Sequence, residues 1–253
     1  MNDLQWKAFS RFREEFRSQV EAWSNQLVEL SDLQKQAAHL AKTPAYPFET
    51  PVVYNRALDE VTQADDIKLI VIGDNPGKDE QLLKNNKYLV GQAGKIAEGY
   101  FKRNPELGID FRKNVIILNK TPVHSAKTAQ LKTIAKLGGE RAARLVEESQ
   151  IWMAEKTVEL HKNLQPGTEL WLVGYSELKE KRIFIGYRDA LKQAYGDAGA
   201  ETDAWEKVFV FQHFSMNRFS IDLNEYMEKN KKSGSLEENI HELGTLHKKE
   251  IFN

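Results

Sequence analysis

The sequence predicts a three-layer α/β/α fold, in which a central four-stranded parallel sheet lies between helices and follows an N-terminal helical extension. Two observations predict it. Short runs rich in β-branched and aromatic residues alternate with helical patterns, which is typical of parallel sheets. These runs are almost continuously apolar, as expected for strands buried on both faces. The four predicted strands are 67–72, 114–118, 169–173 and 207–212.

The first 40 residues are predicted to be helical, because large apolar residues recur there at steps of three and four. The residues of this stripe are Phe9, Phe12, Phe16, Val20, Trp23, Leu27 and Leu30. A loop with prolines at 44, 47 and 51 follows. Between the strands, helices are expected at 92–103, 127–137, 140–164 and within 176–195, with a break at Gly138-Gly139.

The chain from Asn224 onward is polar and helix-prone, with a flexible break expected at 231–235. We expect a single domain over 1–253, consisting of a helical lead-in (1–45), a core (50–220) and a polar helical tail (221–253). The 253 residues suffice for one substantial core.

The composition narrows the class of protein. Apolar residues make up 41% of the chain and charged residues 29%, as in ordinary globular proteins. Cysteine is absent, which excludes disulfides, thiolate nucleophiles, cysteine-ligated zinc and iron–sulfur clusters. No apolar run approaches the roughly 20 residues that cross a bilayer, and no signal peptide is recognisable. We therefore expect a cytoplasmic protein without a membrane partner.

Positive charge is concentrated in one part of the chain. The whole sequence has 36 basic and 37 acidic residues, which argues against binding polyanions over its entire surface. Residues 78–136, however, contain 12 Lys and Arg against 5 Asp and Glu. This window fits either a surface that faces phosphates or a solvated, lysine-rich face.

Polar residues follow each predicted strand where it ends. In open parallel sheets, ligands bind just beyond the carboxyl ends of the strands, so these loops are expected to meet at one crevice. The loops begin with Gly-Asp-Asn-Pro-Gly (73–77), Asn-Lys-Thr-Pro (119–122), Gly-Tyr-Ser (174–176) and His-Phe-Ser-Met-Asn-Arg (213–218).

The side chains at these ends suit chemistry on a polar planar group, although each also has a structural interpretation. Asp74 can accept a proton, and Asn75 can orient a water molecule, but 73–77 also reads as a plain strand-to-helix turn. Asn119 can read the edge of a base or cap a turn. His213 can stabilise a carbonyl oxygen that gains charge, or serve only as a packed histidine.

Other enzyme classes fit less well. Small esterases of the Gly-Asp-Ser type need a serine where Asn75 stands, and amino-methyltransferases share only Asn75-Pro76. No nucleotide-binding glycine loop occurs. His161, His241 and His247 show no metal-ligand spacing, so neither a metal nor a cofactor is expected.

Several motifs resemble the uracil-DNA glycosylase superfamily, in the same order along residues 50–220. Residues 73–77 resemble the first superfamily motif, with Asn75 as in the single-strand-selective and mismatch-specific branches. Tyr-Leu-Val-Gly-Gln-Ala-Gly-Lys (88–95) is similar to a segment of the thermostable bacterial branch. Ile-Leu-Asn (117–119) and His-Phe-Ser (213–215) resemble the base-reading strand and the second motif. Val-Tyr-Asn (53–55) is similar to the single-strand-selective branch.

The resemblance implies a sheet of order 2-1-3-4 and hydrolysis of the N-glycosidic bond of uracil or a related deaminated base in DNA. Such a hydrolase acts in base-excision repair on single- or double-stranded DNA and needs no metal. A monomer is expected. By resemblance, Asn75 positions the water, Asp74 acts as base or supports the cationic sugar, and His213 stabilises the departing base. Asn119 reads the edge of the base.

The remaining implied roles concern base binding and DNA contact. Leu89 replaces a stacking aromatic of the thermostable branch, for which Tyr88 is the candidate substitute. Gly77 stands where another branch has a tyrosine that excludes thymine. Phe214 replaces a proline, and the cluster cysteines are missing. The candidates for DNA contact are Lys120, Ser215, Met216 and Arg218.

Two alternatives remain open at this point. A non-catalytic protein of the same fold could bind a nucleobase, nucleic acid or another ligand, which the altered His-Phe-Ser loop and near-neutral charge favour. A hydrolase or transferase of unrelated chemistry could also use a similar scaffold. Whether the chain is an enzyme therefore stays undecided from the sequence.

Overall fold

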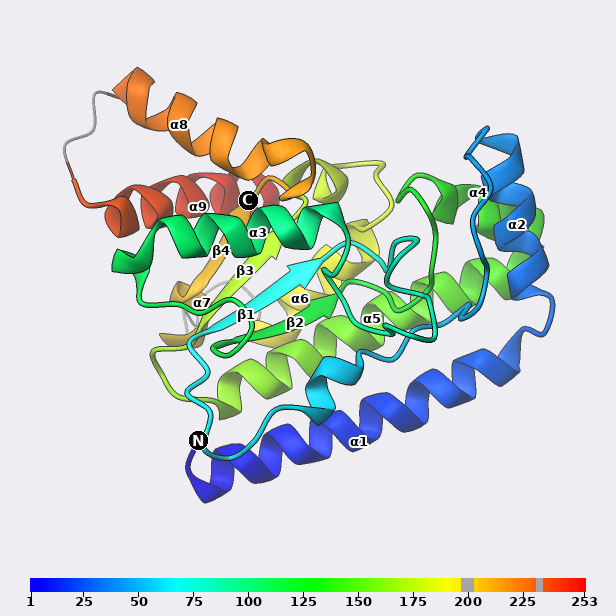
Figure 1. The fold of residues 1–253 in the computed structure, drawn as a ribbon, viewed down its shortest axis with the longest axis horizontal. Coiled ribbons are helices and arrows are strands. Elements are labelled where there is room, and N and C mark those ends of the chain that lie inside the picture. The colour runs from blue at the N-terminus through cyan, green and yellow to red at the C-terminus, as the bar shows by residue number, and fades with distance from the viewer. Residues whose placement is uncertain (197–202, 231–233) are drawn as a thin grey trace.

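A computed structural model describes residues 1–196, 203–230 and 234–253. Its centre is a four-stranded parallel sheet in the order β2-β1-β3-β4, with helices on both faces, which confirms the predicted three-layer fold (Figure 1). Each strand lies within two residues of its predicted bounds. The strands are β1 (Leu69–Gly73), β2 (Val115–Asn119), β3 (Glu169–Val173) and β4 (Val208–Phe211).

The strands are buried along almost their whole length because helices cover both faces of the sheet. Glu169, at the start of β3, is the one strand residue that is partly exposed. The register pairs Gly73 with Asn119 and Val173 with Phe211, so the carboxyl ends of the strands share one edge.

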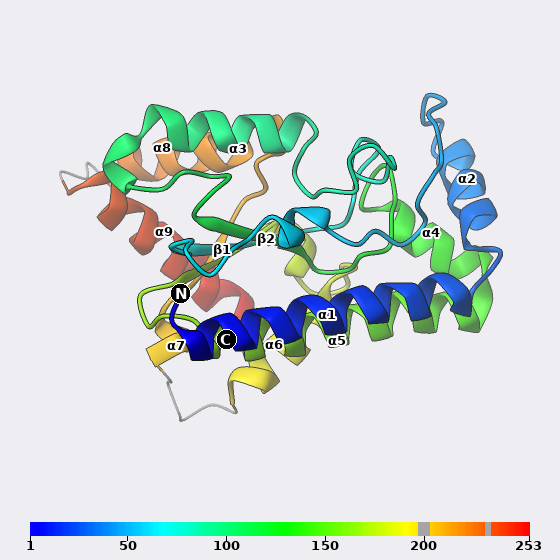
Figure 2. The same ribbon diagram turned by 60° about the horizontal axis from the view of Figure 1, so that its bottom comes forward.

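One face of the sheet is covered by α1 (Asp3–Gln26), α5 (Gly139–Asn163) and α6 (Ile185–Tyr195), with α1 lying along α5 (Figure 2). The predicted lead-in consists of two helices, because α1 ends at Gln26 and α2 (Leu30–Leu40) packs on α4 (Gln130–Leu137). The predicted glycine break separates α4 from α5, with Gly139 at φ +61°.

Over the other face lie α3 (Gln92–Arg103) and α8 (Arg218–Asn230), with aromatic rings between them and the sheet. The ring of Phe219 stacks on Trp171 of β3 at 5.6 Å, and Tyr100 of α3 meets Phe219 edge to face at 5.0 Å. α9 (Leu236–Phe252) packs on β4, where a Cβ added to Gly244 would lie 2.7 Å from the Cβ of Phe209.

Short helices complete the described chain: η1 (Arg56–Asp59), η2 (Pro105–Leu107), η3 (Tyr175–Leu178), α7 (Asp203–Glu206) and η4 (Ser215–Asn217). The predicted helix within 176–195 is thus divided into η3 and α6. The expected break at 231–235 lies partly outside the described residues. None of the helices in the described ranges combines the length and the apolar character that crossing a membrane requires.

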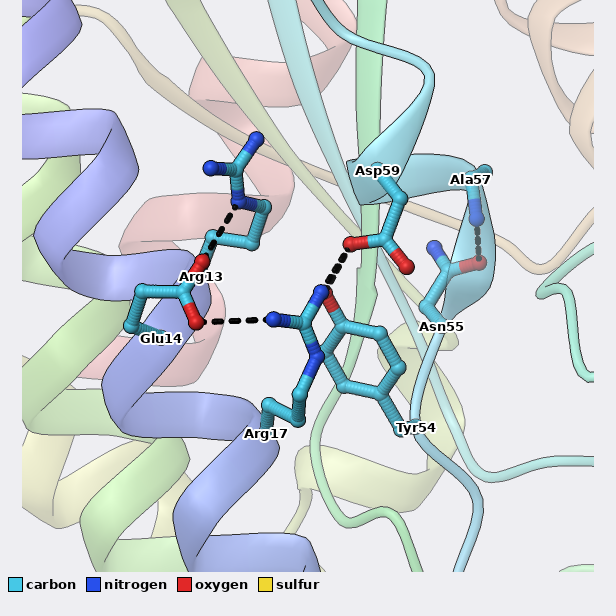
Figure 3. A network of polar contacts seen from close by, with 7 residues as sticks. All are labelled: Arg13, Glu14, Arg17, Tyr54, Asn55, Ala57 and Asp59. Atoms are coloured by element: carbon cyan, nitrogen blue, oxygen red, sulfur yellow. Dashed lines mark hydrogen bonds and ion pairs between the residues drawn. The ribbon is translucent and has the colours of Figure 1, made fainter.

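The segment that enters β1 is held against α1, as Figure 3 shows, and is also hydrogen-bonded to β2. Arg17 of α1 pairs with Asp59, which also accepts a hydrogen bond from the Tyr54 hydroxyl at 2.7 Å. Asn55 is fully buried, accepts from the N–H of Ala57 at 3.2 Å, and donates to the carbonyl of Ile117 at 2.8 Å. The exposed Arg17–Asp59 ion pair contributes little to stability, so the buried side-chain amide of Asn55 holds the segment more strongly.

Candidate functional site

A buried ion pair joins the loops at the carboxyl edge of the sheet. The Lys120 Nζ lies 2.6 Å from Asp74 Oδ1 and also donates to the backbone carbonyls of Gly73, at 3.3 Å, and Val173. Lys120 is completely buried. Burial lowers the pKa of Lys120 below its ordinary value, and the neighbouring Asp74 carboxylate partly opposes that shift. One ammonium group thus connects the ends of β1, β2 and β3.

The loop after β3 closes over this ion pair at Gly174. A Cβ at Gly174 would lie 2.3 Å from Asp74 Oδ1 and 3.1 Å from Lys120 Nζ, and its φ of +94° also favours glycine. The ring of Phe184 lies 5.0 Å from the ammonium on its other side. The ion pair is therefore enclosed by backbone and an aromatic ring.

Asp74 has one oxygen held and one more accessible. Its Oδ1 accepts from Lys120, whereas Oδ2 has only a long contact of 3.4 Å with the Thr128 hydroxyl. The side chain is 12% exposed. A fixed negative charge therefore faces the edge of the sheet through Oδ2.

Asn75 presents a free acceptor. Its Nδ2 donates to the carbonyl and the hydroxyl oxygen of Ser125, both at 3.0 Å. Because the amide nitrogen is used in this way, Oδ1 has no hydrogen-bond partner among the described residues and remains available to a water molecule. Asn75 is half-buried, so water can reach this oxygen.

His124, which sequence reasoning missed, holds the 73–77 loop in place. Its Nδ1 donates to the carbonyl of Pro76 at 2.8 Å, and its Nε2 accepts from the Tyr46 hydroxyl at 3.0 Å. Burial lowers the pKa of His124 to about 4, so the ring is neutral at physiological pH. Nothing in its sequence context signals this contact, which is made only in the fold.

Asn119 carries an unpaired polar group in a buried position. Its side chain is 2% exposed, and its Oδ1 lies against Gly73, where an added Cβ would be 2.4 Å away. Its Nδ2 is buried and has no hydrogen-bond partner in the part of the chain that the structure describes. Turning the amide over would leave the oxygen unpaired instead. Other buried atoms among the described residues also lack a partner, for example the Tyr100 hydroxyl and His247 Nδ1, so the Asn119 donor is one group that a ligand could satisfy.

His213 is a neutral donor at the end of β4. Its Nδ1 accepts the backbone N–H of Ser215 at 3.0 Å, so the proton of the neutral ring is on Nε2. Burial lowers the pKa of His213, while Asp74 raises it and Lys120 lowers it. The charges of both Asp74 and Lys120 therefore act on the imidazole.

The predicted base-binding residues do not all reach this edge. Tyr88 is buried and donates to the carbonyl of Val53 at 2.6 Å, lining a separate cavity of about 570 Å³ beside β2. It therefore does not replace the stacking aromatic. Leu89 is also buried, and its backbone has φ +50°. At Gly77 an added Cβ would meet no atom within 4 Å, so the space beside this residue is open.

Glu80 is a second residue that the sequence did not reveal. Its carboxylate accepts the backbone N–H of Gly77 at 3.1 Å and that of Leu89 at 3.0 Å, joining the two loops. Burial raises the pKa of Glu80 to about 7. The open space beside Gly77 is thus bounded by a loop that a buried carboxyl group supports.

The predicted DNA contacts divide into one buried and three exposed residues. Lys120 has no exposed surface and cannot reach a phosphate, so that expectation is corrected. Met216 is 79% exposed and has φ +54°, while the Ser215 and Arg218 side chains are also exposed. Phe214 is buried against Phe219 at 5.1 Å and anchors this loop.

Asp74, Asn75 and Asn119 lie at or just beyond the carboxyl ends of β1 and β2, and His213 follows β4 at the same edge of the sheet. That the four side chains form one binding site stays a prediction. The set offers a water acceptor, a buried amide donor, a neutral imidazole donor and a fixed carboxylate. It suits binding of a neutral, planar ligand with carbonyl oxygens, and hydrolysis by water. Comparison of the chain with models of protein families, with curated proteins and with solved structures found no match.

Proposed function

We propose that the protein is a DNA glycosylase that hydrolyses the N-glycosidic bond of uracil or a related deaminated base. The observation that carries the proposal is the buried, unpaired amide nitrogen of Asn119. Deaminated bases present carbonyl oxygens on their edges, and such an oxygen would accept from this donor. The target nucleotide must leave the base stack to reach it, at a cost of a few kcal/mol.

His213 supports the departure of the base. Its pKa is lowered by burial, so the ring donates from Nε2 without carrying charge. A neutral donor aimed at a carbonyl oxygen stabilises that oxygen as the base leaves as an anion. Each ~1.4 kcal/mol of this stabilisation increases the rate about tenfold.

Asn75 and Asp74 serve the sugar side of the reaction. The free Oδ1 of Asn75 accepts a hydrogen bond from the attacking water and orients it toward the sugar carbon. Asp74 gives electrostatic support to the cationic sugar through Oδ2, because Lys120 occupies Oδ1. The water oxygen forms the new bond to carbon, the base leaves with the bonding electron pair, and the proton of the water passes to solvent.

The loop 215–218 and the space at Gly77 suit a DNA substrate. Met216 is an exposed apolar tip that can fill the gap left by a flipped nucleotide, and Arg218 stands beside it for a phosphate. The empty space around Gly77 places no atom against a substituent on the base. This part of the proposal therefore predicts that the protein accepts several different deaminated bases.

The test uses single- and double-stranded oligonucleotides that contain one uracil, hypoxanthine or xanthine, followed by alkaline cleavage at abasic sites. We expect the wild-type protein to release at least one of these bases. Asn75→Ala and His213→Ala should each lower the rate by a factor of about 100 or more. His39→Ala, which changes an exposed histidine on α2, is the matched control and should cleave normally.

One observation favours a second candidate, a non-catalytic nucleobase-binding protein. Lys120 already neutralises Asp74, which weakens the field that a cationic sugar would experience. If the wild-type protein leaves every oligonucleotide intact but retards it on a gel, and Asn119→Ala abolishes the retardation, this candidate replaces the glycosylase. Absence of both cleavage and retardation refutes both candidates.

A further inference from the structure

Three side chains of metal-ligand type meet at the opposite, amino edge of the sheet. Glu169 begins β3, and Glu237 and His241 lie on α9. One ligand atom of each lies within 4.8 Å of the other two. The four-residue spacing of Glu237 and His241 places both on one face of the helix, directed at β3.

Neighbouring aromatic residues fix the orientation of two of these side chains. The Trp171 Nε1–H donates to Glu169 Oε2 at 2.8 Å, so Oε1 is directed at His241 Nε2, 2.7 Å away. The imidazole of His241 lies parallel to the ring of Phe209 at 4.6 Å, with 7° between the planes. Metal ligands are commonly oriented by contacts of this kind.

A cavity of about 170 Å³ opens in front of the three residues. Its remaining wall includes Leu107, Ile109 and Lys68. The Lys68 ammonium donates to the carbonyl of Gly108 at 2.9 Å, and among the described residues no lysine forms an ion pair with Glu169 or Glu237. The cavity has room for a water molecule or another small ligand beside the cluster.

We propose that Glu169, Glu237 and His241 bind a divalent transition-metal ion of the zinc class, with a fourth coordination position open to the cavity. One imidazole and two carboxylates suit Zn²⁺, and three protein ligands with an open position form a site that can bind a further molecule. Tetrahedral ligands at about 2.1 Å from zinc lie about 3.4 Å apart. The three ligand atoms lie within 4.8 Å of one another, and the side chain of Glu237 is exposed.

A plain ion pair between Glu169 and His241 accounts for fewer of these observations. That pair does not require the cavity, and Glu237 adds a second negative charge beside His241. An ion bound by all three residues would also join the first turn of α9 to the start of β3. The inference is independent of the glycosylase proposal, because the two sites lie at opposite ends of the strands.

The test is a titration of the full chain, stripped of metal with a chelator, with Co²⁺ alone and then with Zn²⁺ alone. The visible absorption of Co²⁺ reports tetrahedral coordination, and calorimetry gives the stoichiometry and affinity for Zn²⁺. We expect one ion per chain and an intense visible band. Glu237→Gln should weaken binding at least tenfold, and His241→Ala should abolish the band.

Two further variants separate a built site from adventitious binding. Trp171→Phe removes the N–H that holds Glu169, together with part of a buried ring, and should weaken Zn²⁺ binding about 10- to 100-fold while a thermal melt checks that the variant is folded. His39→Ala removes an exposed histidine elsewhere and should leave binding unchanged. Absence of the visible band in the wild-type protein, or equal affinity in Glu237→Gln, overturns the proposal. Glu237 is exposed, so this variant is expected to fold normally.

Discussion

Replacing Asp74 by asparagine should destabilise the protein in a way that depends on pH. The Lys120 ammonium is completely buried and would keep only neutral acceptors, namely the carbonyls of Gly73 and Val173 and the amide oxygen that replaces the carboxylate. Removing one partner of a buried ion pair typically costs 3–5 kcal/mol, because the other charge is left uncompensated. The two carbonyls place Asp74→Asn at the lower end, about 3 kcal/mol at pH 7.

The pH dependence follows from the direction of the Lys120 shift. Burial lowers the pKa of Lys120 in the folded state below 10.5, its unfolded value. Between the two pKa values the unfolded chain binds more protons, so stability rises with pH. Asp74 opposes this shift, and its removal lowers the pKa of Lys120 further. The interval in which stability rises with pH should therefore begin at a lower pH in the variant.

The assay is thermal unfolding of both proteins between about pH 6 and pH 10. A loss of 3 kcal/mol corresponds to a Tm lower by roughly 6–12 °C in a chain of this size. The difference in Tm between the wild-type protein and Asp74→Asn should become smaller as pH rises. The double variant Asp74→Asn with Lys120→Met should be more stable than Asp74→Asn alone, because it no longer buries an unpaired ammonium group. A loss below about 1 kcal/mol, or a difference that is constant across the pH range, would refute the reasoning.

Three further predictions test the loops around the site. Gly94→Ala should destabilise the protein by about 3 kcal/mol or more in a thermal melt, because its Cβ would lie 1.5 Å from the carbonyl oxygen of Leu89. Gly77→Ala meets no atom within 4 Å and should change stability by no more than about 0.5 kcal/mol; equal losses would contradict the packing. Burial raises the pKa of Glu80 from 4.5 to about 7. As pH rises from about 5 to 8, the free energy of unfolding of the wild-type protein in denaturant melts should therefore fall by up to ~3 kcal/mol relative to that of Glu80→Gln. Parallel pH profiles of the two proteins would exclude this effect. Asn119→Leu should keep or raise the Tm while abolishing base release, because it removes an unpaired amide, and a large fall in Tm would show that the amide is satisfied.

The strands and most helices could be predicted because each depends on a local pattern. The bounds of α3 and β3 follow directly from apolar periodicity and flanking turn residues. The break between α1 and α2 was missed, since Leu27 and Leu30 continue the apolar stripe without a glycine or proline. α8 begins at Arg218 directly after Asn217, a non-glycine residue at φ +56° that no sequence pattern announces.

The site could be predicted only as far as strand topology determines it. Asn119 and His213 end strands, so the rule for parallel sheets places them near the 73–77 loop. The direction of a side chain in a loop depends on packing instead. Tyr88 faces the cavity beside β2, and Lys120 turns inward to Asp74, because both orientations are set by contacts with residues distant in the sequence.

The buried Lys120–Asp74 ion pair and the unpaired Asn119 amide do not favour stability of the fold. Replacing a buried ion pair by packed apolar residues is often neutral or stabilising, and an unpaired buried amide costs about 1–3 kcal/mol. Yet Asn119 and Lys120 stand side by side at the end of a strand whose other four residues are Val-Ile-Ile-Leu. A ligand that binds at this edge and pairs with the Asn119 amide would recover free energy that folding alone loses.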